Sequence, residues 1–419
     1  MTDKDKINIK AMSLYSNVDI PQFQERETNR GYISFGADNL YPNYLISLAS
    51  RSARHSAILK TKSRMVGGNG WDKTKLSPAT INFIKNPNYH MNLDEILTKV
   101  SYDLELFNAF SLIITWSKDR ERIARIEYIC PSKVRIAKSE ENGKDIEAYL
   151  ISDGWDNTKK YPPVLYPAFD IYNRKDAQQV LYIKCSEDSS DWYAKPSYIA
   201  GVNWMELDYE LSLFHLNNVK KGFYPSMLIN FNYEPSSDEE MEEVIRRLKA
   251  EYSGSYGAGN VIFTFSEGKE NAPVITPIQS NDNDKKFEQL NSTLETNIFQ
   301  SHQINNPALF GVLQPGKLGN TNELVESLAI FQSMYVDGRQ FLLESLFNKL
   351  ASINGVTDAL HIEKYNLKLE IKMSVGDILS ILTSTISNEQ KVQVFESLGY
   401  TKEQATALVG NSIMPQINN

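Results

Sequence analysis

Two glycine-rich runs could hold a phosphate group, and neither has the surroundings that this chemistry needs. The run 254–259 lacks the Gly-Lys-Ser/Thr ending of a phosphate-binding loop, and residues typical of a strand follow it. Such a loop leads into a helix, because the free backbone N–H groups of the first helical turn bind the anion. The run 66–70 follows a predicted helix and is typical of a helix stop. We interpret both runs as turns.

The histidines, carboxylates and cysteines lack the spacing of a metal site or of an acid–base pair. The five histidines, none of which is at a metal-ligand spacing from another histidine or a cysteine, are His55, His90, His215, His302 and His361. The carboxylates of residues 238–243 occupy the first turns of a predicted helix, where they favour the helix dipole and stay solvated. Cys130 and Cys185 are too few for a disulfide framework or a thiolate site. The sequence therefore predicts no catalytic residues, no metal site and no cofactor.

The charge balance argues against a protein that grips DNA with its whole surface. The 419 residues include 44 Lys and Arg against 52 Asp and Glu, a formal net charge of −8. The basic clusters at 220–221 and 246–249 lie at the predicted C-terminal ends of helices, where cations are expected in any protein. We therefore expect no reading of DNA bases, although an acidic protein can still pass DNA along through sparse, weak contacts.

Composition and length indicate a folded chain of about three structural units, with 41% hydrophobic and 11% aromatic residues. No run of 18 apolar residues occurs, so no transmembrane helix is predicted. The charged residues 1–10 do not resemble a secretory signal. We expect the protein to be made and kept in cytosol-like surroundings, without a membrane partner.

The first half of the chain is predicted to be an α+β unit. Residues 1–39 are polar and indicate an extended arm. Helical spacing runs from Tyr41 to a stop at 67–68, and a second helix begins at Asn92, which forms a capping-box spacing with Glu95. Short β-branched or aromatic runs predict strands at 110–116, 123–129, 133–137, 147–151 and 179–183.

The second half is predicted to be a long helix, a small α/β insert and a second long helix. The long helices cover 196–221 and about 284–302. The insert has strands at 226–231, 261–265 and 274–278, and a helix capped by Ser236. A Pro- and Gly-rich loop follows at 305–320. A third long helix to about 353 with a bend at Gly338, a strand at 367–373 and small helices capped by Ser387 and Thr401 complete the chain.

Three runs in this order resemble the portal proteins of tailed bacteriophages. They are Lys-Pro-Ser-Tyr at 195–198, the helix end and Tyr-Pro-Ser turn at 214–226, and Asn-Pro-Ala-Leu-Phe-Gly at 306–311. The resemblance covers about residues 40–350, while the first 39 and the last 45 or so residues match no feature of the family.

The resemblance implies a portal-like α+β fold. Its parts would be an N-terminal arm (1–39), an α+β wing (40–194), stem helix 1 (195–221), a small α/β clip (222–282), stem helix 2 (283–304), a tunnel loop (305–321), a long bent helix with the wing–crown connection (322–373) and a small helical crown or C-terminal tail (374–419).

The resemblance also implies a function and partners. The chain would form a ring of twelve subunits at one capsid vertex of the virion, after assembly in the host cytoplasm. Double-stranded DNA would pass through the ring without sequence preference during packaging and ejection. The terminase large subunit and the head–tail adaptor would dock on the ring, and major capsid and scaffold proteins would surround it. Catalysis would belong to the partner ATPase, so this chain is not expected to be an enzyme.

Two sets of site residues follow from this resemblance. In the tunnel loop, Leu313, Gln314, Lys317 and Leu318 are expected to face the DNA channel, with Lys317 offering a phosphate contact that salt screens. The alternative is an outer-surface loop with an incidental lysine. In the clip, Glu239, Glu243, Arg246 and Arg247 are expected to dock the motor and the adaptor.

The residues also support a ring without reference to the resemblance, and two other interpretations stay open. Two long helices around a small insert suit an inter-subunit element better than a catalytic cleft, and their apolar faces need a cover that ring neighbours supply. A ring of chains of charge −8 would repel phosphates from its lumen and let DNA slide. The alternatives are another oligomeric phage head–tail connector or minor capsid protein, and an uncharacterised α+β enzyme.

Overall fold

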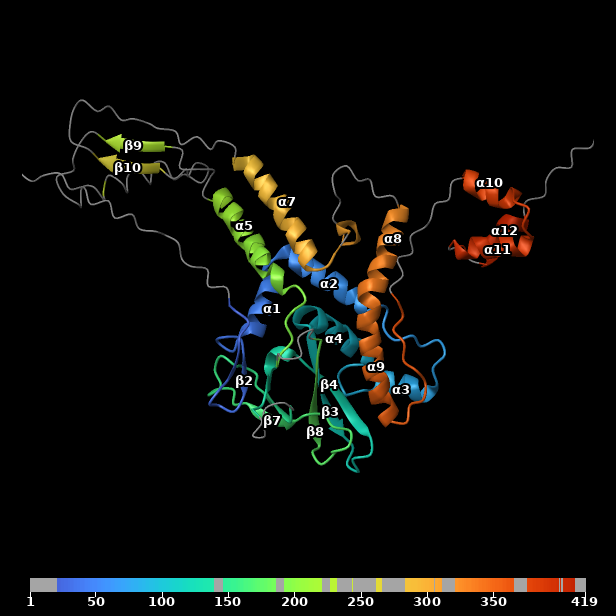
Figure 1. The fold of residues 1–419 in the computed structure, drawn as a ribbon, viewed down its shortest axis with the longest axis horizontal. Coiled ribbons are helices and arrows are strands. Elements are labelled where there is room, and N and C mark those ends of the chain that lie inside the picture. Colours follow the sequence, from blue (N-terminus) through green and yellow to red (C-terminus); the bar gives the residue numbers. More distant parts are fainter. Residues whose placement is uncertain are drawn as a thin grey trace, which may run out of the picture.

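The computed structural model shows a body of sheets and helices from which two neighbouring helices, α5 and α7, project (Figure 1). It describes residues 21–138, 146–185, 192–220, 227–231, 243, 261–265, 283–304, 306–310, 321–364, 375–398, 400 and 402–410. The mixed α and β class that the sequence predicts is confirmed. Among the described helices, none is long and apolar enough to cross a bilayer.

Residues 41–67 form two helices, α1 (Tyr41–Arg51) and α2 (Ala53–Gly67), so the prediction of one continuous helix is wrong. The break falls at Ser52, whose backbone is extended and whose hydroxyl accepts a hydrogen bond from the backbone N–H of His55. Ser52 is therefore the N-cap of α2, because its side chain satisfies an N–H group that the first helical turn leaves unpaired.

Helix α4 (Leu93–Phe107) begins with the predicted capping box. The Asn92 side chain accepts a hydrogen bond from the Glu95 backbone N–H at 2.9 Å, and the Glu95 carboxylate accepts one from the Asn92 backbone N–H at 2.8 Å. The sequence analysis did not predict the short helix α3 (Pro78–Lys85), which precedes it.

Two antiparallel three-stranded sheets form the rest of the body. The first has the spatial order β4 (Ile123–Ile129), β3 (Ala109–Trp116) and β8 (Gln178–Lys184). The second has the order β5 (Val134–Ile136), β6 (Ala148–Ile151) and β7 (Val164–Pro167). Five of these strands were predicted within two residues of their observed ends, and β7 was not predicted.

The segment that the sequence assigns to an arm contributes to the body from residue 23 onward. Strands β1 (Glu25–Glu27) and β2 (Ile33–Phe35) pair antiparallel, and all three residues of β2 are buried. The Tyr193 hydroxyl donates to the Ile33 carbonyl oxygen at 2.6 Å, which joins β2 to the segment between β8 and α5.

Both predicted long helices that flank the insert are present. Helix α5 (Val202–Lys220) starts six residues later than predicted, after the 3₁₀ turn Ile199–Gly201, and α7 covers Asn283–Ser301. Between them lie two strands, β9 (Met227–Phe231) and β10 (Val261–Phe265), which pair in parallel. The predicted insert helix, apart from Glu243, and the strand 274–278 lie outside the described residues.

The third long helix is interrupted by a π-helical segment rather than bent at Gly338. Helix α8 (Thr321–Phe331) continues through the π segment Gln332–Val336 into α9 (Asp337–Ile353). A π turn holds more residues than an α turn, so it changes which side chains of the two halves share a face.

The C-terminal residues form a separate small cluster of helices, α10 (Val375–Thr383), α11 (Asn388–Ser397) and α12 (Lys402–Gly410), around Phe395. The predicted capping box between Ser387 and Gln390 is confirmed. The predicted strand 367–373 and the cap Thr401 lie outside the described residues.

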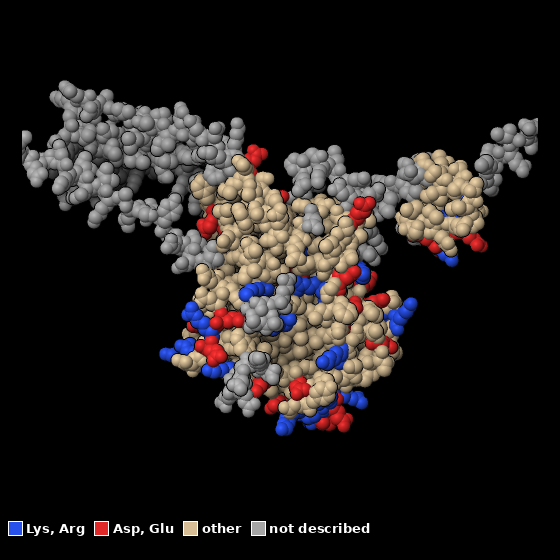
Figure 2. All heavy atoms as spheres, in the orientation of Figure 1, with Lys and Arg blue, Asp and Glu red and all other residues tan. Residues whose placement is uncertain are grey.

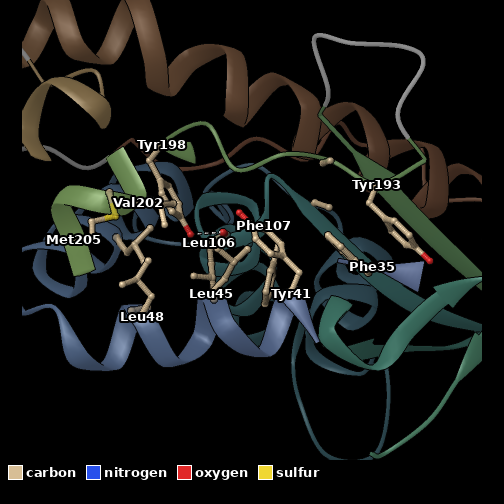
Figure 3. Close-up of a cluster of buried hydrophobic side chains, with 14 of the residues drawn as sticks. Phe35, Tyr41, Leu45, Leu48, Leu106, Phe107, Tyr193, Tyr198, Val202 and Met205 are labelled. Atoms are coloured by element: carbon tan, nitrogen blue, oxygen red, sulfur yellow. Dashed lines mark hydrogen bonds between the residues drawn. The ribbon is translucent and has the colours of Figure 1, made fainter. Parts of the chain in front are cut away.

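Two hydrophobic cores lie in the body. The first joins α1 to α4 and the start of α5: Leu48 of α1 lies toward Val202 and Met205, and Leu45 and Tyr41 lie toward Leu106 and Phe107 (Figure 3). The second lies between α4, the β4-β3-β8 sheet and α9. The long helices are therefore anchored in two cores that share the α2–α4 layer.

Candidate functional site

The residues that the sequence assigned to a function lie mostly outside the described parts of the chain. This holds for Leu313, Gln314, Lys317 and Leu318, and also for Glu239, Arg246 and Arg247. Glu243 is described and is exposed in a helical position. These assignments stay predictions, but the helices on both sides of the loop 305–321 are described, and the end of α7 and the long helix meet at one buried polar cluster.

The centre of this cluster is an ion pair between Lys62 of α2 and Glu105 of α4. The Lys62 Nζ atom lies 3.1 Å from the Glu105 Oε2 atom, and the two side chains are 1% and 0% exposed. Burial lowers the pKa of the Lys62 amine, and the Glu105 carboxylate acts against that shift. A buried ion pair is costly to break from one side, because it leaves the other charge without a partner or water.

The segments before and after the loop 305–321 both contact this ion pair. On the α7 side, the Lys62 ammonium donates a hydrogen bond to the carbonyl oxygen of His302 at 3.3 Å. Beyond the loop and helix α8, the Tyr335 hydroxyl donates to the Glu105 carboxylate at 2.7 Å, and the Lys62 Nζ atom lies 3.9 Å from the centre of the Tyr335 ring. One ion pair thus ties the end of helix α7 to the π segment of the long helix.

A row of aromatic rings also joins helix α7 to helix α8 and the π segment. Phe310, from the turn Pro307–Phe310, lies between Phe299 of α7, at 6.3 Å between ring centres, and Phe331 of α8, at 5.8 Å. Phe331 in turn stacks on Tyr335 at 5.2 Å. The first residues of the loop are therefore packed against both helices that border it.

Two histidines lie next to the ion pair. The His55 Nδ1 atom and the His302 Nε2 atom are 2.9 Å apart, and the Tyr198 ring packs against both imidazoles. Burial, together with the nearby Lys62 charge, lowers the pKa of His55 to about 3 and that of His302 far below its usual value. Both rings are therefore neutral at pH 7, and one imidazole donates an N–H hydrogen bond to the bare ring nitrogen of the other.

The long helix is also fastened to α2 and to the end of α4. The Gln340 side-chain amide donates to the carbonyl oxygens of Met65 and Val66 at 3.2 and 3.1 Å, which satisfies groups that the end of α2 leaves unpaired. The Arg339 guanidinium donates to the Asn108 side-chain oxygen at 2.7 Å.

The corner between α1 and α2 holds the roots of α5 and α7 through charged groups. Arg51 pairs with Glu206 of α5 at 3.0 Å, and Arg54 pairs with Asp208. The Ser52 hydroxyl also donates to Asp208, at 2.7 Å. On the other side, Arg54 donates to the Asn291 side chain of α7 at 3.0 Å.

Helices α5 and α7 approach each other closely at their base. A Cβ atom at Gly201 would overlap the Ser301 side chain, so only glycine permits this approach. In Figure 2, acidic and basic side chains are interspersed over the lower body, while the surface over α5 and α7 is mainly uncharged. The described part of this face therefore carries no large patch of one sign that would hold DNA phosphates tightly.

The cluster fixes the positions of the helices that contribute to it. Within the described ranges, no group of three or more His, Cys, Asp or Glu residues could hold a metal ion. His302, which has no metal-ligand spacing in the sequence, is buried, and its pairing with His55 was not predicted. One signal was visible: Lys62 shares the helical face of Ile58, Leu59, Met65 and Val66, so a lysine occupies a core position of α2.

The comparisons with known proteins agree with this architecture. No family model matches the chain. The probable portal protein of Haemophilus phage HP1 (strain HP1c1) is 20% identical over 338 residues, which are 78% of this chain and 86% of the relative.

Solved structures from particle necks have a similar fold. A chain in the neck of a native gene transfer agent (GTA) particle, computed with C12 symmetry, is 15% identical with a TM-score of 0.52, covering 86% of this chain and 94% of that chain. A chain in the neck of an empty GTA particle, computed with C6 symmetry, is 12% identical with a TM-score of 0.51, covering 88% and 94%. The resemblance drawn from the sequence is confirmed, and the fold is that of these neck chains.

Proposed function

We propose that the chain is a portal protein, which forms a ring at one capsid vertex and passes double-stranded DNA during genome packaging and ejection. The observation that carries this proposal is the match to a probable portal protein over 78% of this chain and 86% of the relative. The presence of the same fold in a particle neck computed with C12 symmetry supports a ring of twelve copies in the virion.

The parts of the chain take the following roles in this proposal. Residues 40–194 are the wing, helices α5 and α7 are the stem, residues 222–282 are the clip, and residues 374–419 are the crown. The loop 305–321 is the tunnel loop, with Leu313, Gln314, Lys317 and Leu318 toward the DNA. The buried Lys62–Glu105 pair supports this role, because it fixes His302, before the loop, and Tyr335, in the long helix that follows it, to α2 and α4.

Partners dock on the ring, and chemistry is left to them. The terminase large subunit and the head–tail adaptor bind the clip through Glu239, Glu243, Arg246 and Arg247. Major capsid and scaffold proteins contact the outer parts of the ring. The hydrolysis of ATP belongs to the motor, and this chain acts as a conduit and an anchor.

Electron microscopy of particles with a labelled chain tests the proposal. A tag at the C-terminus, bound by gold-labelled antibody, is expected at a single vertex at the head–tail junction. Label over the whole capsid surface would assign the chain to another capsid component and overturn the proposal.

The tunnel-loop assignment has its own test. Lys317→Ala is expected to change the amount of DNA packaged per particle, with a dependence on salt, because the contact is to phosphate and is screened over about 8 Å in physiological buffer. Lys364→Ala, which removes an exposed lysine paired with Asp337, is the matched control. Normal packaging by Lys317→Ala would refute the channel position of Lys317.

A further inference from the structure

The long helix carries an outward face that is mainly apolar. Its exposed residues between 325 and 345, Glu326 aside, are apolar or small: Val325, Ala329, Ile330, Ser333, Met334, Gly338, Phe341 and Ser345. The partly exposed Asp337 lies beside them and pairs with Lys364 at 3.0 Å. We call these eight residues the helix stripe. It is about 30 Å long at 1.5 Å per residue. Ile330, Met334 and Phe341 are 52%, 80% and 73% exposed.

The helix stripe has the relief of a packing surface. Its three large side chains alternate with small residues, and a Cβ atom at Gly338 would meet nothing within 4 Å. Large side chains beside open grooves are the arrangement by which a helix packs against another element. Contiguous exposed apolar side chains of this kind mark interaction sites on soluble proteins.

A second exposed apolar surface lies at the edge strand β7. This strand ends the β5-β6-β7 sheet, and its consecutive residues Val164 and Leu165 are 53% and 62% exposed. Their side chains point to opposite faces of the sheet, so together they border the free edge of the strand. We call Val164 and Leu165 the β7 edge. In Figure 1, β7 and the α8–α9 helix lie on opposite sides of the β4-β3-β8 sheet. The body thus carries one unpartnered apolar face on each flank.

Two different faces on opposite flanks are what a closed ring of identical chains requires. Each contact in a cyclic ring is heterologous, so a face of one copy meets a different face of the next copy. The eight residues of the helix stripe include no basic side chain, and the carboxylates of Glu326 and Asp337 lie beside them, so the stripe offers little attraction to DNA phosphates. The described residues that could cover it within the same chain leave it exposed.

We propose that the helix stripe of one copy packs against the β7 edge of the next copy, and that this contact closes the ring. The inference rests on the ring of the proposed function and adds which two surfaces form it. It assigns Met334 and Phe341 on one side and Val164 and Leu165 on the other as the contact residues.

The test uses two complementary variants of the full chain. The stripe variant carries Met334→Glu and Phe341→Glu, and the edge variant carries Val164→Glu and Leu165→Glu. Tyr172→Glu is the matched control, because Tyr172 is 92% exposed and lies outside both faces. Mass in solution is measured for each at a concentration at which the unaltered chain forms rings, with circular dichroism and thermal unfolding as checks of folding.

The proposal predicts a distinctive result on mixing. Each variant alone is expected at the 47.7 kDa of one chain, and the Tyr172→Glu control is expected to form rings. A mixture of the two variants retains one intact stripe and one intact edge, so a capped dimer of twice the chain mass is expected.

Three results would overturn the inference. Rings formed by the folded stripe variant would show that these residues are not the contact, and would leave the portal proposal intact. Two monomeric variants that do not combine would show that the faces do not meet each other. Loss of the ring in Tyr172→Glu would show a general effect of charge. An unaltered chain that never forms rings would contradict the proposed function as well.

Discussion

Lys62 contacts Glu105 in a place that water does not reach, and the same ammonium group contacts His302, before the segment 305–321, and Tyr335, beyond it. The ion pair therefore fixes the end of α7 and the π segment of the long helix relative to each other. In a portal ring, this would hold in place the two helical regions between which the tunnel loop runs.

Removing one partner of this pair is expected to destabilise the chain strongly. Lys62→Met leaves the Glu105 carboxylate buried and unpaired, which costs about 3–5 kcal/mol in the free energy of unfolding. Urea unfolding of the variant and the unaltered chain at equal concentration measures this difference.

A double variant distinguishes a lost charge from lost packing. Lys62→Met with Glu105→Leu removes both charges and keeps similar volume, so most of the lost stability is expected to return. If Lys62→Met alone costs less than about 1 kcal/mol, the pair does not hold the junction as described.

Acid is expected to loosen the junction through the histidine pair. The pKa of His55 is lowered to about 3 in the folded chain, against about 6.5 unfolded, and that of His302 also lies well below its usual value. The unfolded chain therefore binds more protons below pH 6.5, and stability falls as the pH drops from 6.5 toward 3. Each histidine contributes at most about 1.4 kcal/mol per pH unit.

The pH dependence of stability is obtained from the free energy of unfolding at pH 7 and at pH 5. It is measured for the unaltered chain and for a chain carrying His55→Gln and His302→Gln. The pH-dependent loss is expected to be smaller in that variant. Burial raises the pKa of Asp103, so the protonation of this carboxyl group stabilises the folded chain as the pH falls, opposite to the effect of the histidines. Because Asp103 is present in both chains, its contribution to the free energy of unfolding cancels in the comparison. Equal slopes in the two chains would contradict the neutral buried pair.

Ser52 is expected to stabilise the α1–α2 corner through two hydrogen bonds. Ser52→Ala removes the N-cap of α2 and the bond to Asp208, with an expected loss of about 1–2 kcal/mol. Ser52→Thr keeps a hydroxyl and serves as the control. Thermal unfolding of the three chains checks this, and a stability unchanged in Ser52→Ala would show that the corner does not depend on the cap.

Gly201 is expected to be essential for the close approach of helices α5 and α7. Gly201→Ala forces the new methyl group into the Ser301 side chain, at a cost of about 1–3 kcal/mol. The swapped double variant Gly201→Ala with Ser301→Gly is expected to recover stability, because it restores the space. Gly338→Ala is the matched control, since its Cβ position is open and alanine favours the helix. Failure of the swap to rescue would place the strain elsewhere.

Local patterns predicted much of the fold, and long-range contacts explain the rest. The capping box of Asn92 and Glu95 lies within one helical turn, so the sequence alone revealed it. The break at Ser52 was hidden because the apolar spacing continues across it. Strand β2 has three residues, too few for a periodic signal, and it is held by contacts such as Tyr193 to Ile33, 160 residues apart.

The candidate site could not be predicted from local sequence patterns, because its residues meet only through long-range contacts. His55 and His302 are 247 residues apart, and nothing near either one predicts that their rings meet. Lys62 on an apolar helical face did indicate a buried charge, but its partner on α4 follows only from the packing of the two helices. The π segment contains Tyr335, which contacts that pair across the fold, whereas the sequence pointed to a bend at Gly338.

Negative-stain electron microscopy of the purified chain, with its mass in solution, tests the central claim most directly. The account predicts rings with a central hole and a mass of about twelve times 47.7 kDa. A compact monomer that holds a cofactor would contradict it and return the chain to the enzyme alternative.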